Sequence, residues 1–128
     1  AAAMPTVQAL VQSAVSILLV FASMPAMADA MLRERVLAAA PGLAADVLDL
    51  ALEARACAAA AGRAPAATRL AVIDYSRAST EPRLWLIDVK AGRVLAVEHV
   101  AHGRGSGEDR ATRLSNDEGS HQTSLGLY

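Results

Sequence analysis

The chain has 128 residues, with 12 Lys and Arg against 13 Asp and Glu and a formal net charge of -1. This balance argues against general nucleic-acid binding, which needs a clustered basic surface. The single cysteine excludes an intrachain disulfide and a multi-cysteine zinc site. Aromatic residues are only 3% of the chain although hydrophobic residues are 54%, so alanine supplies much of the apolar count and the core has little area to bury.

An apolar run, ALVQSAVSILLVFA, occupies residues 9–22. It is shorter than the ~20 residues that span a bilayer, and Pro25 and the small-x-small pattern Ala26-Met27-Ala28 follow it. We therefore predict a signal peptide over residues 1–28 and only transient membrane contact during export. The exported form is expected to begin at Asp29, with Met31 as the second possibility through the pattern Ala28-Asp29-Ala30. No Lys or Arg precedes the run, and a buried or membrane-anchoring helix is the alternative interpretation.

The next segment, residues 29–67, has a helical pattern. Pro41-Gly42 divides it, because proline disfavours the α region at the residue before it and glycine loosens the turn. Gly62 is placed to end the second helix. Spacings that alternate between four and three predict an apolar stripe along that helix, made of Leu43, Val47, Leu50, Ala54 and Cys57. We expect this stripe to pack on whatever follows.

From Arg69 onward the pattern changes to short runs of β-formers. Three strands are predicted, at Leu70–Tyr75, Leu84–Val89 and Val94–Val100. The four-residue gap between the last two contains Gly92, which is a hairpin signal. Helices followed by a mainly β region predict an α+β fold.

The last part of the chain is rich in glycine and polar residues. Residues 103–122 predict a long loop, and Ser124–Tyr128 are expected to begin another strand. Loops of this length within a compact domain are usually functional or need a partner. In the loop, GRGSG (residues 103–107) lacks both the third glycine of G-x-G-x-x-G and a G-K-[ST] ending, and no helical pattern follows. These glycines therefore indicate positive φ and close backbone approach rather than a phosphate site.

Two kinds of residue could carry thiol or metal chemistry. Cys57 lies on the predicted apolar stripe with no histidine within a few residues, and apolar burial suppresses the reactive thiolate, so we interpret it as structural. If His99 and His102 both lie on a strand, their spacing of three places them on opposite faces, and they could not share one ion. His121 is isolated in the loop without carboxylates at ligand spacing. We predict no metal site and no cofactor.

Arginines and acidic residues alternate through the loop. This pattern favours a solvated surface, and the alternative is that one arginine holds a carboxylate, because the guanidinium fork suits that geometry. The charged residues concerned are Arg104, Glu108, Asp109, Arg110, Arg113, Asp117 and Glu118.

Four segments in order, IDYSRASTEPRLWLID, VAHGRGSGE, LSN and GSHQTSLGLY, together resemble the catalytic domain of the murein L,D-transpeptidase family. The resemblance covers residues 47–128. It implies a β-rich fold with a Cys–His active site that acts on peptidoglycan stem peptides. In that chemistry a thiolate attacks a peptide carbonyl and an amine or water resolves the thioester.

The family's Gly-Cys nucleophile and its His-Gly motif have no match up to Tyr128. The resemblance therefore implies that residues 68–128 are the N-terminal part of a truncated catalytic domain, that the chain contains no catalytic residue, and that it is inactive alone. The predicted signal peptide places the protein in the periplasm or cell envelope. Among the arginines of the loop, Arg104 and Arg113 are our candidates for binding a stem-peptide carboxylate. The alternative is a non-catalytic wall-binding module or a decayed relic of the enzyme.

Overall fold

The computed structural model describes residues 27–63 and 67–128. The chain divides into two compact units, residues 1–32 and 33–128, and all the described strands belong to the second. The predicted signal peptide, residues 1–28, lies outside the described residues except for its last two positions. Among the residues that are described, no helix is both long enough and apolar enough to cross a membrane.

Two helices precede the sheet, as the sequence predicted. The first covers residues 27–39 and the second, α2, covers Ala45–Ala60. The turn between them contains Gly42 at φ 89°, which explains the division. After α2, Gly62 adopts φ 72°, and the N–H groups of Gly62 and Arg63 bond to the carbonyls of Ala59 and Ala58. This is the Schellman arrangement that a C-terminal glycine favours.

The predicted apolar stripe of α2 was wrong in phase. Leu43 precedes the helix, Leu50 is 67% exposed, and Cys57 is also exposed. The buried positions of α2 are instead Leu48 and Ala58. In a helix so rich in alanine, several registers place small apolar residues on one stripe, and the large Leu48 side chain decides which face turns inward.

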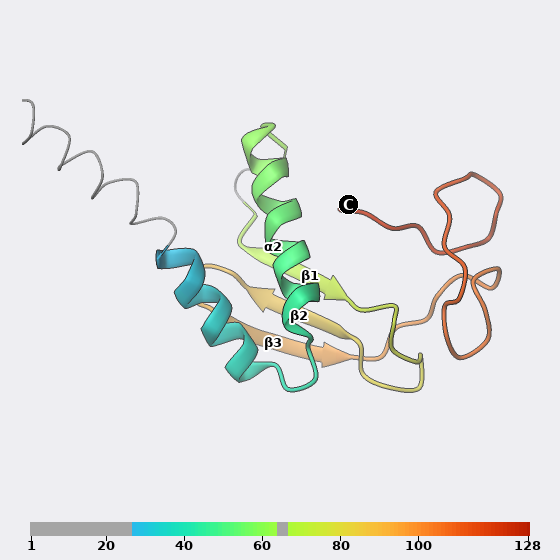
Figure 1. Ribbon diagram of the computed structural model, residues 1–128, viewed down its shortest axis with the longest axis horizontal. Coiled ribbons are helices and arrows are strands. Elements are labelled where there is room, and N and C mark those ends of the chain that lie inside the picture. Colours follow the sequence, from blue (N-terminus) through green and yellow to red (C-terminus); the bar gives the residue numbers. More distant parts are fainter. Residues whose placement is uncertain (1–26, 64–66) are drawn as a thin grey trace, which may run out of the picture. The chain divides into compact units, whose positions relative to one another are not determined.

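The sheet has three antiparallel strands in the order β1-β2-β3 (Figure 1). They are β1 (Arg69–Ile73), β2 (Leu84–Asp88) and β3 (Arg93–Glu98). The predicted hairpin is confirmed, since β2 and β3 pair with Asp88 opposite Arg93. The pairing shifts between Leu86 and Ile87, which indicates a bulge on the β3 side.

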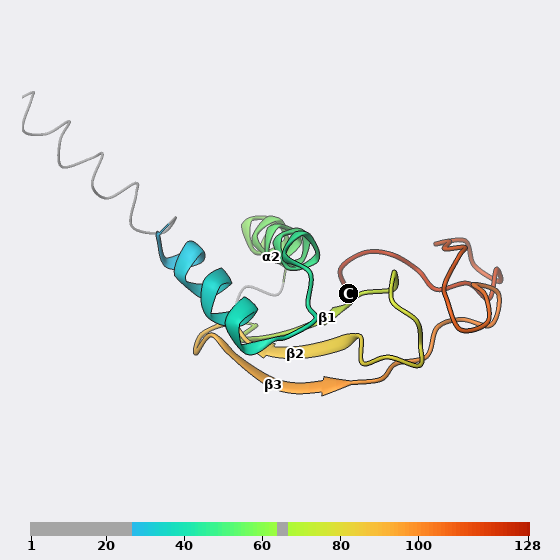
Figure 2. The same cartoon turned by 60° about the horizontal axis from the view of Figure 1, so that its bottom comes forward.

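The core lies between α2 and one face of the sheet (Figure 2). Period-two alternation places alternate strand residues on this face. Cross-strand pairs extend it, with Leu70 opposite Ile87 and Val72 opposite Trp85. All four of these side chains are at most 6% exposed, and Leu48 of α2 is fully buried. The predicted α+β fold, two helices followed by a three-stranded antiparallel sheet, is confirmed.

The chain after β3 forms an irregular segment, residues 100–128, whose described backbone has one isolated bridge, between Leu114 and Thr123. The long loop was predicted, but the strand expected at Ser124–Tyr128 is absent from the structure. Gly126 adopts φ 142° and interrupts an extended run there. The backbone of Leu125 instead bonds to the side chain of Asn116.

Candidate functional site

Arg83 joins the sheet to the irregular segment. It immediately precedes β2, is fully buried, and stacks over the Tyr75 ring at 5.1 Å. Its guanidinium donates to the Val100 carbonyl through Nε (3.0 Å) and Nη2 (2.7 Å), and to the Arg77 carbonyl through Nη1 (2.8 Å). Backbone carbonyls thus surround this buried charge. One side chain fixes both the loop after β1 and the exit of the chain from β3.

The same guanidinium sets the proton position on His102. Arg83 Nη2 lies 2.8 Å from His102 Nδ1, and because arginine can only donate, Nδ1 must accept. The imidazole proton is therefore on Nε2, which donates to the Gly107 carbonyl at 3.3 Å. His102 is thus oriented between Arg83 and the glycine-rich turn.

That turn is held tightly against residues 120–123. Ser106 is fully buried, and its Oγ accepts the Thr123 N–H at 2.8 Å. A Cβ on Gly103 would collide with the His121 carbonyl oxygen, and one on Gly105 would lie 2.7 Å from the Ser120 oxygen. The prediction that glycines here allow close backbone approach is confirmed at both positions, whereas the predicted positive φ occurs in this turn only at Gly107, at 147°.

A third contact fixes the C-terminal residues. The Asn116 amide accepts the Leu125 N–H at 3.0 Å through Oδ1 and donates to the Leu125 carbonyl at 3.2 Å through Nδ2. The side chain thus satisfies one backbone residue in the way a neighbouring strand would. Motifs far apart in sequence, VAHGRGSGE, LSN and SLGLY, therefore form one hydrogen-bonded assembly, which we call the loop assembly (residues 100–128).

A hollow of about 460 Å³ opens beside the loop assembly. Arg104 on its lining is exposed, and its Nη2 lies 3.1 Å from His121 Nε2. The other N–H groups of this guanidinium make no hydrogen bond with the described residues. The hollow, which we call the loop hollow, is lined by Ser79, His99, Val100, Ala101, His102, Arg104, Gly107 and Glu108.

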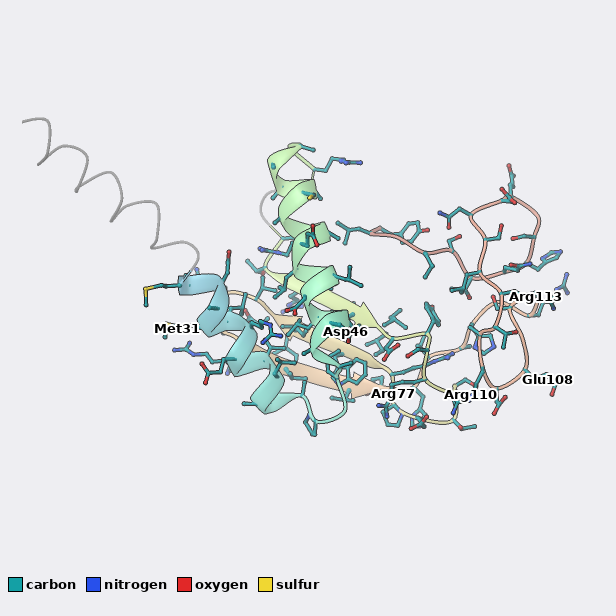
Figure 3. The ribbon with its side chains drawn as sticks, in the orientation of Figure 1. Met31, Asp46, Arg77, Glu108, Arg110 and Arg113 are labelled. Atoms are coloured by element: carbon teal, nitrogen blue, oxygen red, sulfur yellow. The ribbon has the colours of Figure 1, made fainter. Side chains whose placement is uncertain are left out.

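The two candidate arginines differ in position. Arg104 lines the loop hollow, whereas Arg113 does not and is exposed on the loop assembly (Figure 3). The backbone N–H of Arg113 donates to the Ser106 carbonyl at 3.1 Å. Its side chain makes no hydrogen bond with the described part of the chain. The structure therefore brings Arg104, but not Arg113, to a recess.

The prediction that His99 and His102 point to opposite faces assumed that both lie on a strand, and the structure has no strand at these residues. Because β3 ends at Glu98, His99 and His102 lie beyond it and face alternation does not apply. Both line the loop hollow, and His99 Nε2 also lies 3.2 Å from the Thr80 carbonyl oxygen. In residues 27–63 and 67–128, no cluster of three or more metal-ligating side chains occurs.

Cys57 faces a different recess. It lines a groove of about 840 Å³ between α2, β1 and residues 124–128, and no histidine is among the described residues that line this groove. The expectation that Cys57 is buried was wrong. Cys57 and the histidines of the loop hollow nevertheless line different recesses. This agrees with the sequence, in which no histidine lies within a few residues of Cys57.

Sequence reasoning missed Arg83. A signal was present, because Arg83, Trp85 and Ile87 are alternate residues and alternate side chains of a strand point to the same face. If Trp85 and Ile87 face the core, Arg83 at the start of β2 is expected to be buried with them, as it is. Only the folded structure shows which carbonyls and which imidazole this arginine contacts.

A protein-family model described as the L,D-transpeptidase catalytic domain matches residues 39–128. The match covers α2, the whole sheet and the loop assembly, which is more than half of the chain. Neither the curated proteins nor the solved structures gave a match. On the family match, the chain belongs to the L,D-transpeptidase catalytic domain family.

Proposed function

We propose that this chain serves in peptidoglycan cross-linking or trimming as part of an L,D-transpeptidase that forms a cysteine thioester. The observation that carries the proposal is the family match over residues 39–128, because it spans the sheet and the loop assembly rather than one short motif. The family acts on the cell wall, so its substrate lies in the envelope. We further propose that residues 1–28 direct export to the periplasm or cell envelope.

In the proposed reaction, a thiolate attacks an amide carbonyl of the stem peptide. A C–S bond forms, the C–N bond breaks, and the released amine takes a proton from a histidine acting as general acid. An acceptor amine or water then attacks the thioester carbonyl, loses a proton to the same base, and frees the thiolate. The outcome is cross-linking when an amine attacks and trimming when water attacks.

We propose that Cys57 is not that thiolate. It is exposed on α2, and the groove around it has no described histidine that could take its proton. A cysteine nucleophile is activated by an adjacent general base that takes the thiol proton. Residues 1–128 would then supply framework and substrate-binding surface without a catalytic residue, and this chain alone would be inactive.

The substrate-binding surface that we propose is the loop hollow. Arg104 offers an exposed guanidinium at its lining, and a carboxylate can accept two parallel hydrogen bonds from such a fork. His102 is fixed beside it by Arg83. Glu108 lines the same hollow and opposes an anionic ligand. We therefore assign the stem-peptide carboxylate to Arg104 in preference to Arg113.

Activity is tested with purified muropeptides and mass spectrometry of the products. We expect no acyl transfer by residues 1–128 and no difference between this chain and its Cys57→Ser variant. Turnover that disappears in Cys57→Ser would show that Cys57 is the nucleophile and would overturn this part of the proposal.

Binding is tested by calorimetry with a synthetic tetrapeptide stem that carries a free C-terminal carboxylate. Loss of a charge-assisted hydrogen bond costs about 1.5–3 kcal/mol, so Arg104→Gln should weaken binding roughly tenfold or more. Arg113→Gln is the matched control and should leave binding unchanged, while Glu108→Gln should strengthen it. Equal losses in both arginine variants would indicate unspecific charge attraction and contradict the assignment.

A further inference from the structure

His121 has an unusual backbone conformation. Among the described residues it alone combines a side chain with a positive φ, at 56°, in the left-handed region that glycine adopts most easily. The chain doubles back within the loop assembly (Figures 1 and 2), and the His121 carbonyl oxygen accepts the Gly105 N–H at 2.8 Å. The same oxygen occupies the space that a Cβ on Gly103 would need. The backbone at position 121 would therefore suit glycine.

The side chain of His121 has one hydrogen-bonding contact. Its Nε2 lies 3.1 Å from Nη2 of Arg104, and the imidazole makes no other hydrogen bond with residues 27–63 and 67–128. Because arginine can only donate, Nε2 is the acceptor, and the proton of the neutral ring lies on Nδ1. Arg104 lines the loop hollow, whereas His121 does not. The imidazole therefore contacts the guanidinium from outside the lining.

A contact of this kind changes how Arg104 can bind a ligand. The Arg104 side chain is exposed, and a free arginine loses rotamer freedom when a ligand immobilises it. A hydrogen bond made before the ligand arrives removes part of that loss. The contact with His121 occupies one N–H of the guanidinium, which leaves enough N–H groups for the two parallel bonds that a carboxylate accepts.

We propose that His121 is a positioning residue for Arg104, and that it holds the guanidinium, before any ligand binds, in the orientation that receives a carboxylate in the loop hollow. The left-handed backbone is strained because a side chain is needed at a position where glycine would fit. Since the carboxylate is the one assigned to Arg104 above, this role rests on the proposed function.

The variant that tests this role is His121→Gly in the full chain, with calorimetry of the same synthetic tetrapeptide stem. Glycine relieves the strain at φ 56° and removes the imidazole, so the Tm should stay the same or rise. Binding should nevertheless weaken about fivefold, because the ligand must then immobilise Arg104. His121→Gln should restore most of the affinity, since its amide oxygen can accept from Arg104. Unchanged affinity in His121→Gly would overturn the proposal.

Gln122→Gly is the matched control. Gln122 is the next residue, it has no positive φ, and its side chain makes no hydrogen bond with the described residues. Glycine there adds only backbone freedom, so the Tm should fall slightly while the affinity for the tetrapeptide stays the same. Equal weakening of binding in Gln122→Gly and His121→Gly would show that the loss comes from a loosened loop, and would contradict the role of the imidazole.

A double-mutant cycle separates this role from the proposed function. In the Arg104→Gln background, His121→Gly should change the affinity no further, because the imidazole acts only through the guanidinium. An additional loss of binding would show that His121 reaches the ligand by another route and would refute positioning. If Arg104→Gln by itself leaves the affinity unchanged, the carboxylate assignment fails, and the failure belongs to the proposed function.

NMR spectroscopy tests the restraint without any ligand. Relaxation of the Arg104 Nε–H group should show a restrained side chain in the wild type and a mobile one in His121→Gly. The ring-nitrogen shifts of His121 in mildly alkaline buffer should show the proton on Nδ1. A mobile Arg104 side chain in the wild type, or a proton on Nε2 of His121, would overturn the proposal whatever the tetrapeptide does.

Discussion

The helix–sheet core and the loop assembly are held together by different forces. In the core, large side chains such as Trp85, Ile87 and Leu48 are at most 1% exposed and make few polar contacts. In the loop assembly the large apolar residues Leu114, Leu125 and Leu127 are all more than a third exposed. Its order comes instead from side chains that bond to backbone, notably Ser106 and Asn116.

This difference explains which residues each region can replace. Burial is non-directional and depends mainly on area and volume, so the core should accept apolar substitutions of similar size. The loop assembly depends on atoms at fixed positions, and a replacement without the same donor and acceptor leaves a backbone group unpaired. Arg83 belongs to both regions, since it is buried with the core but bonds to Val100 and His102 at the start of the loop assembly.

The largest effect is expected for Trp85→Ala, which should reduce the free energy of unfolding by about 3–5 kcal/mol. Both regions should be lost together, because the loop assembly has little core of its own. Trp85→Phe should cost less, since it keeps most of the volume and removes an indole N–H that has no partner in the described structure. Thermal melts followed by circular dichroism measure both variants. A folded loop assembly in Trp85→Ala would show that the two regions are independent.

The next effect, about 3 kcal/mol, is expected for Arg83→Met. Methionine fills much of the space but cannot donate to Val100, Arg77 or His102. Hydrogen exchange should show the loop assembly losing protection before β1 and β2 do. Arg93→Met at the exposed start of β3 is the control. Equal loss of protection throughout would mean that Arg83 only fills the core.

A smaller effect, about 1 kcal/mol, is expected for Asn116→Ala. The change removes both bonds to Leu125 but no buried area, so faster amide exchange should be confined to residues near Leu125. Asp117→Ala, whose side chain makes no hydrogen bond with the described residues, is the neighbouring control. Faster exchange in β1 or β2 would contradict the separation of the two regions.

The smallest effect concerns the exposed pair of Arg33 and Asp49, which are 2.5 Å apart from Nε to Oδ1. The hydrogen bond from Arg33 lowers the pKa of the Asp49 carboxyl below its ordinary value. A depressed carboxyl pKa contributes stability that is present above the unfolded-state pKa, about 3.9, and is lost as pH falls through the folded-state pKa. The stability difference between wild type and Asp49→Asn, measured by urea unfolding at several pH values, should therefore be small at pH 7 and vanish in acid. A difference that grows in acid would contradict the pairing.

Local patterns in the sequence determined the elements of the core. Pro41-Gly42 and Gly62 act through backbone conformation, and the hairpin around Gly92 acts through turn geometry, so each could be predicted from neighbouring residues alone. The phase of α2 could not. Alanine provides nearly equal apolar area on every face of that helix, and only packing against β1 selects the face with Leu48 and leaves Cys57 exposed.

For the candidate site, the sequence by itself indicated that arginines of the loop could bind a carboxylate. It also indicated the resemblance to a family, and the match over residues 39–128 confirms that resemblance. It did not determine which residues meet. Arg83 reaches His102, and Asn116 reaches Leu125, across sequence separations of 19 and 9 residues. Such contacts depend on how the chain returns after β3, because side-chain hydrogen bonds require both atoms within about 3 Å and no local periodicity specifies that distance. The tertiary structure alone therefore separates Arg104, which lines a hollow, from Arg113, which does not.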